Sequence, residues 1–369
     1  MRSEPSGMSP ATRRRAWATT VPNSAAVSCS SLSVAFALPE AASPWRLSAR
    51  ACGLLSLLDI DLAWCLLLLD MASVPSRISD IQAEVSSQPS CWRQASALAS
   101  VAALPDPGAR VALVGCGTSR FVAEAVAAWR EAGGHGESDA FAASEMPDRR
   151  SYDVVVVISR SGTTTEVLRL VNAVSSHVDV LAITGDPSTP IAEVSKRNIS
   201  LRFADERAVV QTRFATSVLV LWRAHFGHDV DRLARQAEEA LSGPLPERVE
   251  GYRQYVFLGQ GAGVGLANEA ALKLREASLC WSEAYPAMEL RHGPISLLDE
   301  GSLVWSLDPL PPGLEDDIKA TGATLEGPAG QNDPMVELVR VHRAGIAIAE
   351  AKGLDPGRPR HLARSVVLQ

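Results

Sequence analysis

The stretch that decides the fold is residues 154–166, which read VVVVISRSGTTTE. Four valines and an isoleucine in a row predict a strand buried on both faces, as in parallel sheets covered by helices. The hydroxyl side chains and Gly162 then predict a turn, and residues 164–174 predict a helix. Such a turn gathers hydroxyls and backbone N–H groups beside the positive end of a helix, which suits a phosphate. We therefore expect residues 159–164, hereafter the phosphate loop, to bind phosphate.

An ordinary helix cap is the competing interpretation, because Ser and Thr cap helices routinely. One cap needs a single hydroxyl, whereas this loop carries several, namely Ser159, Ser161, Thr163 and Thr164. The loop also lacks the Gly-Lys-Ser/Thr sequence of a Walker A motif. Phosphate binding is the interpretation that accounts for the surplus hydroxyls.

Short apolar runs alternate with helical patterns from residue 110 onward, which predicts parallel α/β units. The first series has strands at 111–114, 154–158 and 178–183 and helices at 120–131, 164–174 and 208–224. The second has strands at 255–258 and 303–307 and helices at 266–277, 314–320 and 335–352. Both series open with a strand, a glycine loop and a helix. We predict two doubly wound lobes, related by internal duplication, with the second one shorter.

These patterns divide the chain into five segments. We expect an N-terminal extension that is disordered or mis-assigned (1–70), a leading helical segment (71–109), a first lobe (110–228), a polar helical linker (229–250), and a second lobe with the C-terminal tail (251–369). Met71 would then be the true start. The Leu-rich run at 54–69 contains Asp59 and Asp61, and each acid would cost roughly 2.5 to 3.5 kcal/mol at a bilayer centre. We expect no membrane span and a cytoplasmic protein.

Charge and cysteine content narrow the range of partners. A net charge of −7 argues against a general nucleic-acid or membrane-surface partner. The six cysteines are scattered, without a Cys-x-x-Cys pair or zinc-ligand spacing, so we expect neither a disulfide framework nor a metal site. Cys116 is expected to pack rather than react, and no cofactor is implied.

A second strand-to-helix loop, GCGTS at residues 115–119, is expected at the same edge of the sheet. Open α/β sheets bind ligands at the carboxyl ends of their strands. Thr118 and Ser119 would therefore add hydroxyl donors beside the phosphate loop. The dinucleotide-binding alternative needs a third glycine, and this chain has Arg120 in its place.

Glu269, Lys273 and Glu276 are spaced four and three residues apart, so they share one face of the helix expected at 266–277. A solvated salt-bridge stripe is the ordinary interpretation of that spacing. The neighbouring sequence ELRHGP at 289–294, however, places His292 in a sharp turn. A carboxylate with an imidazole is the acid–base pair that ring opening and proton transfer between C1 and C2 of a sugar require.

Five segments, taken in order, resemble those of the double-SIS (sugar isomerase) family. They are GCGTS (115–119), SRSGTT (159–164), NEAALKLRE (268–276), ELRHGP (289–294) and PRHLARSV (359–366). The resemblance extends over roughly residues 90–369. It is closest to the isomerase half of glutamine:fructose-6-phosphate amidotransferase and to free-standing SIS-type amino-sugar-phosphate isomerases and deaminases. It implies two SIS lobes, a phosphosugar substrate and a homodimer with a shared active site.

The resemblance also implies residue roles. Phosphate would be held by Ser119, Ser159, Ser161, Thr164 and the backbone of Arg160. Glu276 would move the proton between C1 and C2, Lys273 would stabilise the enediolate, and His292 would open the ring in the site of a neighbouring subunit. Glu206, Val209 and Gln211 fall in the family's sugar-contacting segment.

Two departures from the family bear on the reaction. No cysteine directly follows Met1 or Met71, so we expect no glutaminase half. The family's tail lysine is Arg364 here, and its protonated guanidinium cannot form a Schiff base, although it could bind substrate oxygens. The expected function is an isomerase or deaminase of a hexosamine or ketohexose 6-phosphate. The alternatives left open are a non-catalytic phosphosugar-binding regulator, a simple aldose–ketose isomerase, and a transaminase of the amidotransferase kind.

Overall fold

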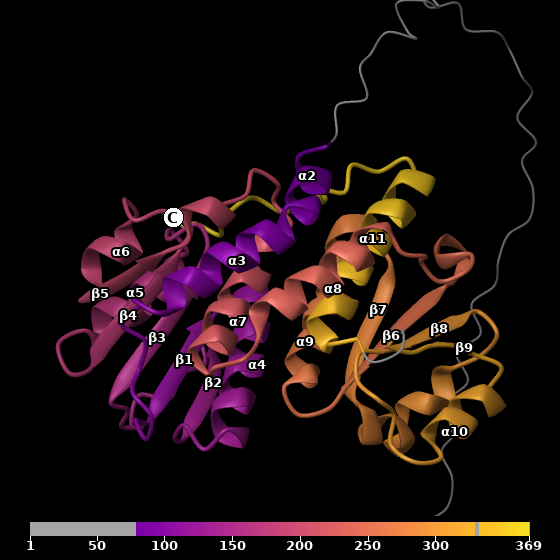
Figure 1. The fold of residues 1–369 in the computed structure, drawn as a ribbon, viewed down its shortest axis with the longest axis horizontal. Coiled ribbons are helices and arrows are strands. Elements are labelled where there is room, and N and C mark those ends of the chain that lie inside the picture. The colour runs from indigo at the N-terminus through magenta and orange to yellow at the C-terminus, as the bar shows by residue number, and fades with distance from the viewer. Residues whose placement is uncertain (1–78, 329–331, 369) are drawn as a thin grey trace, which may run out of the picture. The chain divides into compact units, whose positions relative to one another are not determined.

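The computed structural model describes residues 79–328 and 332–368 (Figure 1). The extension expected at 1–70 and the first part of the leading segment lie outside these residues. Within the described ranges, no helix has the length and apolar character needed to cross a bilayer.

The first lobe is a five-stranded parallel sheet in the order β2-β1-β3-β4-β5. Its strands are β1 (Val111–Gly115), β2 (Ser138–Ala142), β3 (Val154–Ser159), β4 (Asp179–Thr184) and β5 (Arg197–Ser200). Its helices are α4 (Thr118–Ala132), α5 (Thr165–Val174), α6 (Pro190–Val194) and α7 (Arg213–His225), with a 3-10 turn η1 (Arg202–Ala204). Val156 and Ile158 pack toward α4 and α7, whereas Val155 and Val157 pack toward α5. The central strand is thus buried on both faces, as its valines predict.

The second lobe is a four-stranded parallel sheet in the order β7-β6-β8-β9. Its strands are β6 (Gln254–Gly259), β7 (Trp281–Pro286), β8 (Ser302–Ser306) and β9 (Thr324–Glu326). Its helices are α9 (Gly263–Ser278), α10 (Leu314–Ala320) and α11 (Pro334–Ala351), with 3-10 turns η2 (Val249–Gly251), η3 (Ala287–His292) and η4 (Pro294–Leu297). The strand order repeats that of the first four strands of the first lobe. The predicted fold class, two α/β lobes with mainly parallel sheets, is confirmed.

Helices α4 and α9 join the two lobes. A Cβ atom at Gly265 would lie 2.7 Å from the Phe121 carbonyl oxygen and 2.7 Å from the Ala125 nitrogen, so the helices meet where only glycine fits. This close contact places the polar face of α9 beside the amino end of α4, where Thr118 lies.

Three further helices pack against α7 and α11. They are α2 (Asp80–Ser86), α3 (Gln88–Ala99) and α8 (Val230–Ser242). The indole of Trp92 on α3 donates to Thr216 on α7 at 2.9 Å inside the core. The segment expected as a polar helical linker contains helix α8, which buries Leu233, Ala234 and Ala237 against the rest of the core.

One predicted helix begins later than expected. The pattern predicts a helix from residue 208, but α7 starts at Arg213. The Glu206 carboxylate accepts hydrogen bonds from the backbone nitrogens of Thr212 and Arg213, and these contacts fix the start of the helix. Ala208 and Val210 fit the helical period because they are buried, but they lie in an irregular segment.

The C-terminal tail, residues 359–368, returns from the second lobe to the first. Figure 1 shows it leaving α11 and ending near α5 and α6. The Thr165 N–H, in the first turn of α5, donates to the Val366 carbonyl at 3.2 Å. The tail therefore ends, within the described residues, beside the start of α5 and the phosphate loop.

Candidate active site

The phosphate loop connects β3 to α5. The Ser159 hydroxyl accepts from the Gly162 N–H at 3.2 Å and lies 3.5 Å from the Thr164 hydroxyl. Gly162 has φ +61°, and a Cβ atom there would lie 2.1 Å from the Thr189 hydroxyl, so the turn requires glycine. Thr164 occupies the N-cap position of α5, yet its side chain makes no capping hydrogen bond. The cap interpretation therefore does not account for the Thr164 hydroxyl.

Two hydroxyls of the loop meet the C-terminal tail. Ser161 and Thr163 contact the Ser365 hydroxyl at 3.1 and 2.9 Å. The Arg160 side chain points away from the loop, and its guanidinium donates to main-chain carbonyls elsewhere. Only the backbone of Arg160 is therefore left to face a ligand.

A cluster of four polar side chains lies where α9 meets α4; we call it the lysine cluster. The Lys273 ammonium donates to the Thr118 hydroxyl at 2.8 Å and to the Glu276 carboxylate at 2.6 Å, and it lies 3.4 Å from the Glu269 carboxylate. The Thr118 hydroxyl is also 3.2 Å from Glu269. The side chains of Lys273 and Glu269 are only 2% and 1% exposed. The interpretation as a solvated stripe is therefore wrong.

Burial sets the charges within the lysine cluster. It raises the pKa of Glu269 to about 7, and the positive charge of Lys273 limits the rise. Burial alone would lower the pKa of Lys273, but the neighbouring carboxylates Glu269 and Glu276 outweigh it and the net shift is upward. Lys273 is thus a permanent cation at neutral pH. The Glu276 side chain is 19% exposed, so it is the cluster carboxylate that a ligand can reach.

The segment from Glu206 to Gln211 lies between these two features. Glu206 is buried, and its charge helps to raise the pKa of Lys273 while its carboxylate lies 3.9 Å from the Arg160 guanidinium. One Glu206 oxygen caps α7; the other, like the Gln211 side-chain oxygen, is buried without a hydrogen-bond partner among the described residues. Val209 is held by its N–H, which donates to the Gly357 carbonyl at 3.0 Å. This segment therefore offers two oxygen acceptors to a ligand.

The remaining predicted site residues lie outside the phosphate loop and the lysine cluster. Ser119 is buried in the first turn of α4. The Arg364 side chain reaches the Asp205 carboxylate at 2.5 Å. His292 ends η3 and is exposed, and no hydrogen bond or ion pair within the described part of this chain joins it to the lysine cluster. Within the described residues, the expected Glu276–His292 pair is therefore not joined by a hydrogen bond or an ion pair.

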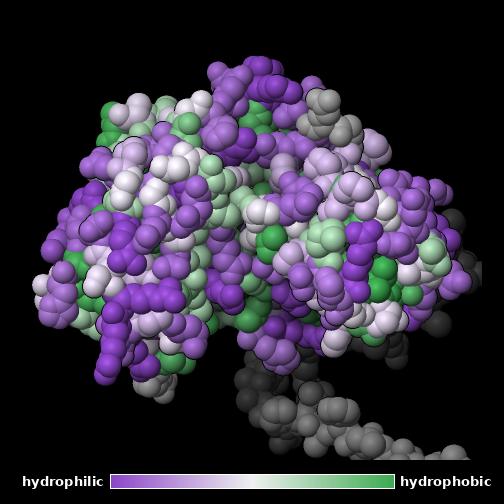
Figure 2. All heavy atoms as spheres, turned by 90° about the horizontal axis from the view of Figure 1, so that it is seen from below, coloured by the Kyte–Doolittle hydropathy of each residue, from purple (hydrophilic) through white to green (hydrophobic). Residues whose placement is uncertain are grey.

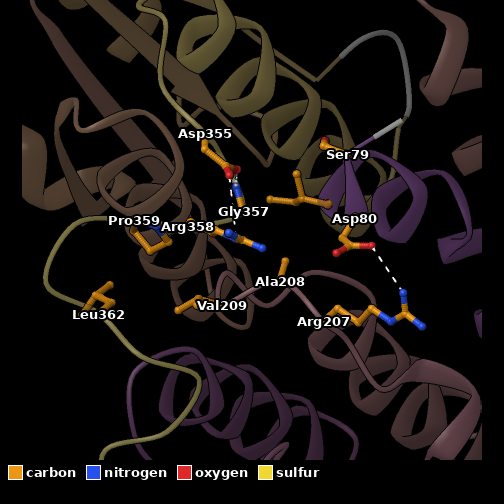
Figure 3. A pocket seen from close by; sticks show the side chains of 11 residues that line it. Ser79, Asp80, Arg207, Ala208, Val209, Asp355, Gly357, Arg358, Pro359 and Leu362 are labelled. Atoms are coloured by element: carbon orange, nitrogen blue, oxygen red, sulfur yellow. Dashed lines mark hydrogen bonds and ion pairs between the residues drawn. The ribbon is translucent and has the colours of Figure 1, made fainter. Parts of the chain in front are cut away.

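A pocket of about 730 Å³ lies apart from this constellation (Figure 3). It is lined by residues 79–81 at the start of α2, by residues 207–209, and by residues between 355 and 362. Of the predicted site residues, only Val209 lines it. Its charged groups pair locally, Arg207 with Asp80 at 4.0 Å and Arg358 with Asp355 at 3.9 Å. It contains neither the loop hydroxyls nor the lysine cluster, so its volume does not mark the active site.

Sequence reasoning missed two participants. Glu269 was assigned to the stripe but given no role, because spacing alone does not distinguish a buried carboxylate from an exposed one. Ser365 belongs to the tail segment that resembles the family, yet it is 204 residues from its partner Ser161. No local pattern pairs positions that far apart.

The first lobe matches a known family model. Residues 106–224 match the family model described as the SIS domain. The match covers the first lobe, about a third of the chain. The matched residues include the phosphate loop and Thr118 of the lysine cluster, while α9 brings the rest of that cluster from outside the matched range.

Curated relatives resemble the chain over a longer range. Glutamine–fructose-6-phosphate aminotransferases (isomerizing) from Pyrobaculum aerophilum and Xylella fastidiosa are each 28% identical to it, over 59% and 70% of this chain. These alignments cover 44% and 52% of the relatives. The chain therefore spans about half the length of the curated relatives it matches.

Solved structures extend the similarity to both lobes. Glucosamine-6-phosphate deaminase from Thermotoga maritima matches with a TM-score of 0.69 and 25% identity, covering 79% of this chain and all of that one. Tagatose-6-phosphate ketose/aldose isomerase from Escherichia coli matches with a TM-score of 0.63 at 18% identity, covering 79% and 96%. Both lobes therefore share the fold of these solved structures.

Proposed function

We propose that this protein is a phosphosugar isomerase or deaminase that acts on a hexosamine or ketohexose 6-phosphate. The lysine cluster carries the proposal: a buried ammonium is held between two carboxylates and a hydroxyl, close to a segment that also contacts the phosphate loop. A carboxylate can move a proton, and a fixed ammonium can stabilise the oxyanion that forms. The similarity to a glucosamine-6-phosphate deaminase and to a ketose/aldose isomerase supports this class of reaction.

In the proposed reaction the phosphate loop anchors the 6-phosphate, and the opened sugar extends toward the lysine cluster. Glu276 takes the proton from C2, and the electron pair of that C–H bond forms the C1–C2 double bond. The π bond of the C1 carbonyl breaks at the same time and leaves its electron pair on O1, which gives an enediolate or enolamine. Lys273 stabilises the negative charge on oxygen. Glu276 then returns the proton to C1, while the C2 hydroxyl or amine gives up a proton and O1 takes one up. A hexose thereby becomes a ketose. With an amino sugar, C2 becomes an imine carbon, to which water adds and from which ammonia leaves.

A substrate panel tests the proposal. Purified protein is incubated with glucose, fructose, glucosamine, galactosamine and tagatose 6-phosphates, and both ammonia release and aldose–ketose conversion are followed. Ammonia from an amino sugar would identify a deaminase, and conversion without ammonia would identify an isomerase. Binding of a phosphosugar without turnover of any panel member would contradict the enzyme proposal and favour a binding regulator.

The phosphate loop should govern binding more than folding. We expect Ser159→Ala combined with Thr164→Ala to weaken phosphosugar binding at least about tenfold, because each lost hydrogen bond to a charged group is worth about 1.5 to 3 kcal/mol. Calorimetric titration gives the affinity, and thermal unfolding should show little change. Ser175→Ala, at the other end of α5, is the matched control. Equal affinities in the variant and the control would refute the phosphate assignment.

The exposed position of His292 leads us to propose a homodimer in which His292 reaches the site of the neighbouring subunit. Met288 and Leu297, on either side of it in sequence, are 48% and 59% exposed, and Trp281 on the same lobe is 71% exposed. Figure 2 shows hydrophobic side chains exposed among hydrophilic ones on this lobe. Exposed apolar groups of this size commonly mark an interface.

Subunit mixing tests the shared site. Glu276→Gln and His292→Ala chains should each have low activity, but in a mixed dimer one site combines an intact Glu276 with an intact His292 from the other chain. Random mixing should therefore restore about a quarter of wild-type activity. Analytical ultracentrifugation checks that dimers form. A mixture no more active than its components would place His292 and Glu276 in the same chain's site or outside the reaction.

A further inference from the structure

Arg160 in the phosphate loop has a side chain that is only 1% exposed. Its guanidinium donates to the Ala208 carbonyl at 2.8 Å and to the Arg364 carbonyl at 3.0 Å. One buried cation therefore contacts the main chain of the sugar-side segment and of the C-terminal tail. These partners are 48 and 204 residues away in the sequence.

The chemistry of these contacts suits a fixed connection. A guanidinium is planar and presents its donors in a rigid fork, so it can hold two carbonyls in one relative geometry, which an ammonium cannot reproduce. A buried cation also needs compensation, and the Glu206 carboxylate, 3.9 Å away and fully buried, supplies it. A neutral replacement would leave the two carbonyls unpaired and Glu206 without its cation.

The other contacts between the tail and the phosphate loop use groups that a phosphate needs. Ser161 and Thr163 share the Ser365 hydroxyl, and the Thr165 N–H at the start of α5 is taken by the Val366 carbonyl. A bound phosphate would compete for these hydroxyls and for this N–H. The Arg160 side chain points away from the loop, so its bond to the Arg364 carbonyl does not compete.

We propose that Arg160 is a positioning residue whose buried guanidinium keeps the tail and the Glu206–Gln211 segment in place on the phosphate loop when a ligand takes over the loop hydroxyls. The ligand's identity as a phosphosugar rests on the proposed function. The placement of the tail does not, because it is a property of the ligand-free chain.

Hydrogen exchange of the ligand-free protein tests the connection. We expect Arg160→Met to speed amide exchange in residues 364–368 at least about tenfold, and Arg160→Lys, which keeps the charge but not the fork, to give a smaller increase. Arg130→Met is the matched control. Arg130 is equally buried and donates to the carbonyls of Ala109 and His135, at the amino end of β1.

The expected pattern is fast tail exchange in the Arg160 variants and wild-type tail exchange in Arg130→Met. Equal tail exchange in all variants would overturn the assignment, as would equal acceleration in Arg130→Met, which would indicate general destabilisation. Titration adds an independent readout. Arg160→Met should weaken binding of glucosamine 6-phosphate more than that of inorganic phosphate, because the sugar also needs the tail and the Glu206–Gln211 segment. Equal losses for both ligands would likewise contradict the assignment.

The two proposals fail in different ways. A wild-type protein that binds neither inorganic phosphate nor any phosphosugar contradicts the proposed function, and the exchange comparison still decides the role of Arg160. If the protein turns over a phosphosugar but amide exchange in the tail is the same with and without Arg160, the proposed function stands and the positioning role of Arg160 is refuted.

Discussion

Replacing Glu276 with glutamine should stop the exchange of solvent deuterium into C2 of a bound hexosamine or hexose 6-phosphate. Without a carboxylate that accepts the C2 proton, the rate should fall on the order of 10² to 10⁴-fold, the usual contribution of a general base. The amide oxygen can still accept the 2.6 Å hydrogen bond from Lys273, so the cluster should stay assembled. Nuclear magnetic resonance of the sugar measures the exchange, and calorimetry should show that binding survives.

His292→Ala is the informative comparison for Glu276→Gln. Ring opening precedes proton transfer, and phosphosugars also open slowly in water, so this variant should exchange slowly but measurably. The different responses would separate the two steps. If Glu276→Gln exchanged C2 deuterium at the wild-type rate on every sugar it binds, Glu276 would not be the base and a binding role would become the better account of the chain.

The buried strands could be predicted from the sequence, whereas several edge strands could not. Residues 154–158 form an unbroken apolar run because helices cover both faces of β3, and that run is visible without a structure. Strand β2 reads SDAFA and all five of its residues are only partly buried. Strand β5 reads RNIS and lies at the sheet edge. Neither strand has the apolar or alternating composition from which a strand is predicted. Backbone hydrogen bonds to a neighbouring strand hold each of them in place.

The same limit applies to the site. The phosphate loop and the α9 stripe could be predicted because each depends on residues close in sequence. The hydrogen bond between Lys273 and Thr118 joins positions 155 apart, and the bond from Arg160 to the Arg364 carbonyl joins positions 204 apart. These contacts depend on how α9 packs on α4 and where the tail returns. Local spacing carries no information about either.

Burial of Glu269 predicts a specific dependence of stability on pH. Its pKa is raised from 4.5 to about 7 in the folded protein, so between these values the folded state binds more protons than the unfolded state. The contribution of Glu269 to the free energy of unfolding therefore falls as the pH rises from about 4.5 to about 7. Glu269→Gln should remove that part of the slope. Urea unfolding at several pH values measures it.

Lys273→Met should have the largest effect on stability, because it removes the cation that lies between Glu269 and Glu276. Breaking a buried ion pair by deleting one partner costs about 3 to 5 kcal/mol. The cost should be smaller at pH 5 than at pH 8, because protonation of Glu269 relieves the uncompensated charge. Adding Glu269→Gln to Lys273→Met should recover much of the loss at pH 8 without restoring turnover, since the oxyanion would still lack its ammonium. A loss equal at both pH values, and unchanged by Glu269→Gln, would show that Lys273 does not compensate a buried carboxylate.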